Sequence, residues 1–163
     1  MPDLVLRHID PRKDDTWREP LRQHFLRFDR TSLRQRFMSP ADATTVDHYL
    51  AASRPEWMVV LEDAGRIVAC AEVHAVPGET HCEVAVSVEP AYQSRGLGKR
   101  VVHAAAEDCQ RRGITELRVY CDQENTRMQK IARSFKSRSL PIAHWAMAAF
   151  SLRLGGAAGV RAA

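Results

Sequence analysis

A glycine-containing turn between a strand pattern and a long helix pattern constrains this 163-residue chain more than any other feature. Residues 84–100 read VAVSVEPAYQSRGLGKR, in which Pro90 ends the strand and Gly96 and Gly98 open the helix. Glycines there remove side chains where backbone must approach a ligand, and a helix start offers unpaired N–H groups and a positive dipole end. The turn therefore predicts a phosphate or pyrophosphate site.

The residues around these glycines exclude two common phosphate loops. The dinucleotide fingerprint G-x-G-x-x-G requires a third glycine where Val101 stands. A P-loop requires glycine where Gln93 stands and Ser or Thr where Arg100 stands. A plain glycine turn without a ligand is the remaining alternative.

The rest of the chain alternates between apolar spacings typical of helices and of strands. The predicted elements are a strand over 4–9, helices over 14–38 (broken near 29–32) and 44–52, a hairpin over 57–62 and 67–76, a strand over 82–88, a helix ended by Gly113, a strand over 117–121 and a helix capped by Asn125. This order predicts a mixed α/β layer architecture.

Composition limits the class of protein. The length fits one domain, predicted over residues 1–155 with a loose tail over 156–163, and the charge of +4 is mild. No apolar run approaches the roughly 20 residues of a membrane span, and the N-terminus has no signal-peptide pattern, so we expect a cytoplasmic protein without membrane contact. The four cysteines are scattered and the seven histidines lack ligand spacing, which predicts reduced, mostly buried thiols and no metal site.

Residues 93–98, Gln-Ser-Arg-Gly-Leu-Gly, resemble the Q/R-x-x-G-x-G/A signature of the GNAT N-acetyltransferases. The preceding V-x-V-x-P pattern and the later residues 125–128, Asn-Thr-Arg-Met, also match in place and spacing, so the resemblance covers about residues 4–135. It implies the GNAT fold: a central mixed, mostly antiparallel sheet, splayed at the middle strands, with helices on both faces. It also implies acetyl-CoA as cosubstrate.

The resemblance implies a cofactor site residue by residue. The strand backbone at Val86, Ser87 and Val88 would pair with the pantetheine arm, and Asn125 would lie near that arm, cap its helix, or do both. The pyrophosphate would be held by the amides of Ser94, Arg95, Gly96, Leu97, Gly98 and Lys99. The acetyl thioester would lie in a V-shaped gap between the strands at Val88 and Leu117.

Acetyl transfer to an amine needs a proton acceptor, because an alkylammonium has a pKa of about 10.4. Glu83 is the candidate base, since its setting resembles the A-E-x-A-V stretch of GNAT protein-lysine acetyltransferases; a solvated strand-edge carboxylate is the alternative. Glu72 is the second choice, and His81 is the histidine to test. Many relatives carry a tyrosine general acid where Ala132 stands here, so thiolate departure is expected to be unassisted or to use water.

The acyl acceptor is expected to be a primary amine, on a small molecule or a protein lysine. The arginine-rich residues 27–36 somewhat resemble bacterial protein-lysine acetyltransferase domains, and basic walls favour an acidic small molecule or acidic surroundings of a lysine. No nucleic-acid partner is expected, because reading motifs and stacking aromatics are absent. The chain is expected to be a monomer or homodimer. A non-catalytic acetyl-CoA-binding regulatory module is the alternative function.

The segment after Phe135 carries two competing patterns. Residues 142–150 have helical spacing, whereas Phe150, Leu152 and Leu154 alternate as in a strand. Relatives close the sheet with two antiparallel strands, so we predict strands near 136–140 and 145–154 and disorder after Gly155. Lys136 stands where relatives have a left-handed glycine, which is expected to cost roughly 1 kcal/mol.

Overall fold

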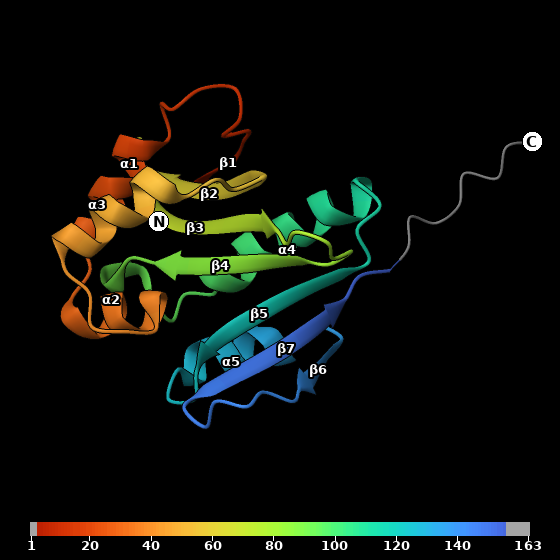
Figure 1. Cartoon of the computed structure of the whole chain (residues 1–163). Coiled ribbons are helices and arrows are strands. Elements are labelled where there is room, and N and C mark those ends of the chain that lie inside the picture. Colours follow the sequence, from red (N-terminus) through yellow and green to blue (C-terminus); the bar gives the residue numbers. More distant parts are fainter. Residues whose placement is uncertain (1–2, 156–163) are drawn as a thin grey trace, which may run out of the picture.

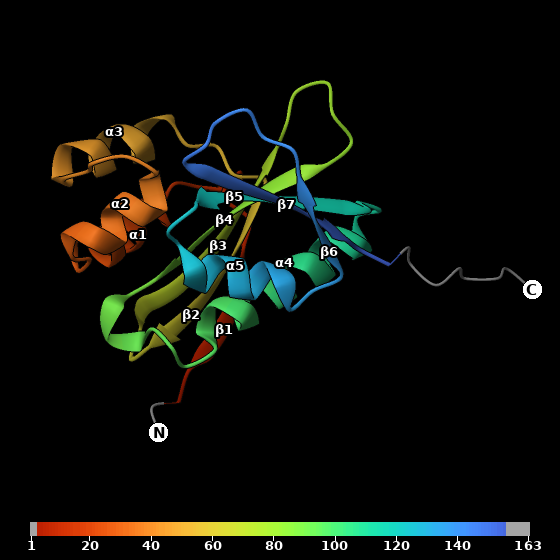
Figure 2. The same cartoon turned by 90° about the horizontal axis from the view of Figure 1, so that it is seen from below.

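A computed structural model describes residues 3–155 of the chain. Its elements are β1 (Val5–Ile9), α1 (Arg18–Leu26), α2 (Arg30–Phe37), α3 (Ala43–Ala52), β2 (Trp57–Asp63), β3 (Arg66–Ala75), β4 (Cys82–Val88), a 3-10 turn at Pro90–Tyr92, α4 (Leu97–Arg111), β5 (Glu116–Asp122), α5 (Thr126–Arg133), β6 (Ser137–Leu140) and β7 (Met147–Arg153). The strands form one sheet in the order β1-β2-β3-β4-β5-β7-β6. Figures 1 and 2 show α1–α3 on one face of the sheet and α4 and α5 on the other, which confirms the predicted fold class.

The sheet is splayed between its two parallel strands. β4 and β5 pair only at Cys82 with Leu117 and at Glu83 with Arg118, and beyond these pairs the strands diverge. All other neighbouring strands pair antiparallel. The expectation that Leu117 borders the open gap is wrong, because Leu117 lies in the paired part and is fully buried.

Local signals start and stop the helices as predicted. The Asp29 carboxylate accepts the N–H of Ser32 at 2.7 Å and separates α1 from α2. The Asn125 side chain accepts the N–H of Met128 at 3.1 Å and caps α5. Gly113, at φ +78°, follows α4 in the left-handed conformation that lets the chain turn away.

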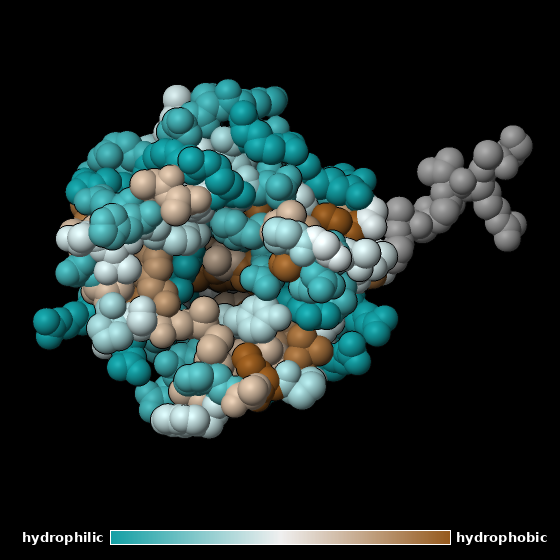
Figure 3. Space-filling model, viewed as in Figure 1, coloured by the Kyte–Doolittle hydropathy of each residue, from teal (hydrophilic) through white to brown (hydrophobic). Residues whose placement is uncertain are grey.

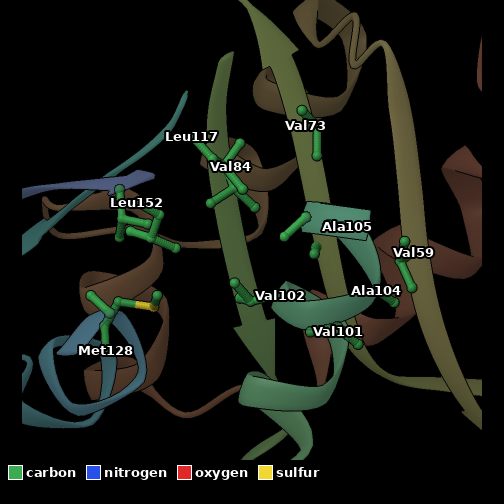
Figure 4. Packing of buried hydrophobic residues seen from close by; sticks show 14 of the residues in the cluster. Val59, Val73, Val84, Val101, Val102, Ala104, Ala105, Leu117, Met128 and Leu152 are labelled. Atoms are coloured by element: carbon green, nitrogen blue, oxygen red, sulfur yellow. The ribbon is translucent and has the colours of Figure 1, made fainter. Parts of the chain in front are cut away.

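Two apolar cores lie on the two faces of the sheet. The larger joins the sheet to α4 and α5, and Figure 4 shows side chains of α4, among them Val101 and Ala105, against the strands. The smaller joins β2 and β3 to α1–α3 through fully buried residues such as Leu21 and Phe25. All four cysteines are buried and unbridged, as predicted. No helix in residues 3–155 has the length and apolar character needed to cross a membrane.

The C-terminal segment completes the sheet as predicted. β7 pairs with β5 from Met147 to Arg153, and β6 pairs with β7, so the strand pattern prevails over the helical one. Lys136 does not have a positive φ, so the expected left-handed penalty does not arise. The disorder predicted after Gly155 lies outside the described residues.

Candidate active site

A cavity of about 430 Å³ lies where β4, α4, α5 and α2 meet. Eight of the residues predicted to bind the cofactor line it: Val86, Val88, Ser94, Gly96, Leu97, Gly98, Lys99 and Asn125. Ser87 and Arg95 are not brought into the lining; the Arg95 guanidinium instead lies over the Tyr92 ring, 5.2 Å from its centroid. The structure thus gathers most of the predicted set at one place.

The glycine turn gives this cavity its shape. Ser94 and Gly96 have φ of +60° and +76°, so the backbone reverses sharply just before α4 begins at Leu97. The unpaired amides at the start of α4 therefore lie at the cavity wall. A Cβ at Gly98 would stand 2.7 Å from Ile131 Cδ1, so a side chain there would displace the end of the Ile131 side chain or enter the cavity.

The backbone of β4 presents alternate residues to the gap. The N–H of Glu89 donates to the carbonyl of Val68 at 2.8 Å, so in this antiparallel ladder Glu89, Ser87 and Ala85 direct their backbone groups toward β3. Val86 and Val88 consequently direct theirs toward the gap. The Val88 carbonyl accepts a hydrogen bond from Gln93 Nε2 at 3.2 Å, which agrees with this alternation.

Ser87 faces the opposite side of the sheet. Its hydroxyl lies 2.9 Å from Nε2 of His24, whose Nδ1 lies 3.0 Å from the carbonyl of Ile67. Burial lowers the pKa of His24 to about 3, so the ring is neutral: Nδ1–H donates to the carbonyl, and Nε2 accepts from the hydroxyl. Ser87 therefore connects β4 to α1.

The cavity of about 430 Å³, called the main cavity from here on, is basic. Its charged lining residues are Arg36, Lys99, Arg127 and Lys130, and none of its lining residues within 3–155 is acidic. Arg127 Nη1 donates to Oε1 of Gln93, which fixes the first residue of the glycine motif between α5 and β4. Helix N–H groups and cations together suit phosphate groups, so the residues present fit the phosphates of a coenzyme A molecule.

A second cavity of about 120 Å³ meets the first across the gap. The residues shared by both linings are Gln35, Arg36, Val86, Asn125 and Met128. The second cavity is also lined by Glu83, His74 and Tyr120. Figure 3 shows a hollow in this face of the molecule, where Figure 1 draws β4 and β5 diverging. Glu83 occupies the last paired position of β4 and therefore the apex of the gap.

The other catalytic candidates from the sequence are placed differently. Glu72 is fully buried, and its carboxylate accepts hydrogen bonds from Arg36 and from the Tyr49 hydroxyl, at 2.8 Å for the latter. It is therefore a partner in a buried ion pair. His81 is buried outside both linings, with Nδ1 3.8 Å from Glu79. Ala132 is fully buried, and Tyr120 is among the residues that line the second cavity.

Sequence reasoning missed several lining residues. Arg127 and Lys130 lie three positions apart near the start of α5, a spacing that puts them on one helix face and could have indicated a phosphate contact. His74 could not have been found in this way, because its place beside Glu83 depends on the strand register. Arg36 was expected in a basic wall, but its side chain is only 8% exposed and paired with Glu72.

A sheet splayed at two parallel strands, with a basic cavity entering the gap beside a glycine turn, defines the class of acetyl-CoA-dependent acyltransferases. The chain belongs to the acetyltransferase (GNAT) family, whose profile matches residues 18–135. This confirms the resemblance seen in the sequence, with acetyl-CoA as the cosubstrate.

Solved structures share the fold at low sequence identity. The GNAT domain of S. lividans PAT is 18% identical, with a TM-score of 0.74, over 91% of this chain and 89% of that one. The ribosomal-protein-S18-alanine N-acetyltransferase from Escherichia coli is 15% identical, with a TM-score of 0.66, over 97% of both chains. The Salmonella typhimurium protein yncA, solved with its cofactor acetyl-CoA, is 16% identical, with a TM-score of 0.62, over 99% of both. No curated protein sequence matches this chain.

Proposed function

We propose that the protein transfers an acetyl group from acetyl-CoA to a primary amine, on a small molecule or a protein lysine, by direct attack in a ternary complex. The observation that carries this proposal is the meeting of two cavities at the gap in the sheet. One cavity is basic and bordered by the glycine turn, and the other holds Glu83. A cosubstrate and an acceptor entering from the two sides would meet near Val86 and Asn125.

The main cavity would hold acetyl-CoA, which supplies the activated acetyl group as a thioester. The amides from Ser94 through Lys99, including Arg95, would bind the pyrophosphate, with Arg127 and Lys130 adding positive charge. The backbone groups of Val86 and Val88 that face the gap would pair with the pantetheine arm, next to Ser87. Asn125 caps α5 and would also lie beside the arm, so its two expected roles are compatible.

Glu83 would accept the proton of the attacking amine. It lines the second cavity at the apex of the gap, where the amine must arrive. An amine with a pKa of about 10.4 is almost wholly protonated at neutral pH, and a carboxylate within reach lowers the barrier to its deprotonation. Backbone N–H groups of β4 directed at the gap could stabilise the oxyanion.

Helix α2, which contributes Gln35 and Arg36 to both linings, also carries exposed basic residues. Arg30 and Arg34 of α2 are exposed, and Arg34 Nη2 lies 4.0 Å from Asp122. Arg27 and Arg36 are held by buried glutamates and add little to an approaching ligand. This favours an acceptor whose amine lies near acidic groups. The active form would be a monomer or homodimer in the cytoplasm.

Release of free CoA from acetyl-CoA across polyamines, amino acids, aminoglycosides and lysine peptides tests the proposal. At least one amine should raise CoA release well above the hydrolysis rate. With that amine, Glu83→Gln should lower kcat by about a hundredfold near pH 7, and part of the loss should return at high pH, where more amine is neutral. Glu79→Gln is the matched control, because Glu79 is 57% exposed and outside both linings.

A regulatory module that binds acetyl-CoA without catalysis is the second candidate, favoured by Ala132 in the place of the tyrosine general acid. It predicts cofactor binding with no amine-dependent CoA release anywhere in the panel. Full activity of Glu83→Gln at pH 7 would instead support the enzymatic function but exclude Glu83 as the base.

A further inference from the structure

The cross-strand neighbour of Glu83 is a histidine. In the β3–β4 ladder His74 lies directly opposite Glu83, and directly opposite residues of an antiparallel pair carry their side chains on the same face, with Cβ atoms about 5 Å apart. Both side chains line the second cavity. On its other side Glu83 pairs with Arg118, whose Nε is bonded to Glu116 at 2.8 Å.

The His74 ring differs from the buried ring of His24. Both nitrogens of His24 have partners in the protein, at 3.0 and 2.9 Å. Within residues 3–155, no hydrogen-bond partner lies near the ring nitrogens of His74, and the residue is half-buried and borders the second cavity. A ring without partners beside a cavity is free to exchange a proton with a bound molecule or with its carboxylate neighbour.

Burial of the His74 ring favours its neutral form. Burial, the largest effect, lowers the pKa of His74 below its usual 6.5, and Arg36 lowers it further. Glu72, Glu83 and Glu56 act in the opposite direction. At neutral pH the ring is therefore an uncharged base next to Glu83.

We propose that His74 receives the amine's proton from Glu83, so that the two residues form a proton relay at the apex of the gap; this rests on the proposed acetyl transfer. The ammonium N–H bond breaks and the Glu83 carboxylate gains the proton. The carboxyl group then passes it through one bridging water molecule to a neutral ring nitrogen of His74, because the two side chains do not contact each other directly. The imidazolium releases the proton to water, which restores both groups, and no electrons are transferred.

The relay overcomes a limit of a lone carboxylate. A proton left on Glu83 in a narrow cavity, with the acceptor covering it, has no route to solvent until the product leaves. His74 lies near the end of β3, next to exposed Ala75, and so offers a route to solvent away from the acceptor. The carboxylate is thereby restored without waiting for product release.

An NMR titration tests the coupling without any acceptor. The imidazole signals of the protein would be followed against pH, with His74→Gln used to assign the His74 signal. The His74 midpoint should lie below 6.5 and should fall further in Glu83→Gln, because the variant loses a negative charge that favours the imidazolium. A midpoint unchanged by Glu83→Gln would overturn the relay.

Kinetics with an amine found active in the CoA-release panel test the relay itself. His74→Gln should lower kcat by about tenfold or more near pH 7, leave the KM for acetyl-CoA unchanged, and move the acidic limb of the pH profile. His48→Gln is the control, because His48 is an exposed histidine of α3 outside both linings. A His74→Gln profile that coincides with that of His48→Gln would overturn the relay.

Failure of the relay and failure of the proposed function give different results. If no amine is acetylated, the proposed function fails, and with it the relay, whatever the titration shows. If amines are acetylated but His74→Gln behaves as the control does, the function stands and the relay alone fails. If His74→Gln is inactive, His74→Asn, which also cannot be protonated, should be inactive too while both variants still bind acetyl-CoA; loss of that binding would indicate a structural role and overturn the relay.

Discussion

Two pairs of cations on opposite sides of the central sheet have opposite surroundings. On the α1–α3 side, Arg27 donates to Glu89 at 3.0 Å and Arg36 to the buried Glu72. On the α4–α5 side, Lys99 and Lys130 line an open cavity and form no ion pair within the described part of the chain. A buried cation held by a carboxylate connects elements of the fold, whereas an unpaired cation beside a glycine turn is available to a phosphate.

The largest expected effect comes from removing a carboxylate on the α1–α3 side, where Arg27 and Arg36 are held in ion pairs. Glu72→Gln keeps the shape of the side chain but leaves the Arg36 charge buried without compensation, so the free energy of unfolding should fall by about 3–5 kcal/mol. Denaturant unfolding measures it. Glu62→Gln is the control, since its partner Arg7 is 60% exposed and the change should cost less than about 1 kcal/mol. Equal losses in the two variants would remove the distinction between buried and surface pairs.

The next effect concerns the α4–α5 side, where the cavity lies beside the glycine turn. Gly98→Asp places a carboxylate at the wall shared with Ile131 and next to Lys99, so the Kd for acetyl-CoA should rise roughly a hundredfold, about 2.7 kcal/mol. Calorimetric titration measures it. Gly98→Ala adds the Cβ without the charge and so separates the effect of shape from that of charge. The double variant with Ile131→Val removes the Cδ1 atom that this Cβ would meet at 2.7 Å. Unchanged affinity in Gly98→Asp would place the cofactor elsewhere.

A smaller effect comes from His24, the neutral histidine of α1 that is hydrogen-bonded to Ser87 of β4. Because the folded pKa of His24 is about 3 and the unfolded value about 6.5, the unfolded chain binds a proton that the folded chain does not. This contribution to stability is present above pH 6.5 and is lost as the pH falls toward 3. The loss amounts to about 2 kcal/mol at pH 5. Comparing unfolding at pH 7.5 and 5 should show a smaller drop in His24→Asn than in the parent, and no such reduction in His48→Gln.

The smallest effect tests one unpaired cation. Lys130→Gln should weaken acetyl-CoA binding by about fivefold and reduce its dependence on salt, because a single charge near a phosphate contributes on the order of 1 kcal/mol. Lys13→Gln removes the same charge outside the main cavity and should leave the Kd unchanged. If both variants bind acetyl-CoA equally well, Lys130 has no role in binding its phosphates.

The sequence predicted what depends on local periodicity and on turns. The glycine turn, the Asn125 cap and the paired strands after Phe135 lie where spacing and the family resemblance put them. It did not predict register. Leu117 was placed at the open gap, because alternation identifies the buried face of a strand but not the neighbour to which each residue pairs.

Charge partners were equally hidden from the sequence. Arg27 and Arg36 were expected in a basic wall because they lie in an arginine-rich run, yet glutamates 62 and 36 positions away hold them. Ser87 was grouped with Val86 and Val88, although strand alternation directs its hydroxyl toward α1. Contacts between distant residues decide which members of a run remain free to bind.

The alternation of β4 also has a consequence for hydrogen exchange. The N–H groups of Ala85 and Ser87 belong to the β3 ladder, so their deuterium uptake should require the sheet to open. Those of Val86 and Val88 face the gap and should exchange orders of magnitude faster. A single strand would then carry slow and fast amides at every second residue, and a ligand filling the gap should slow only the fast ones.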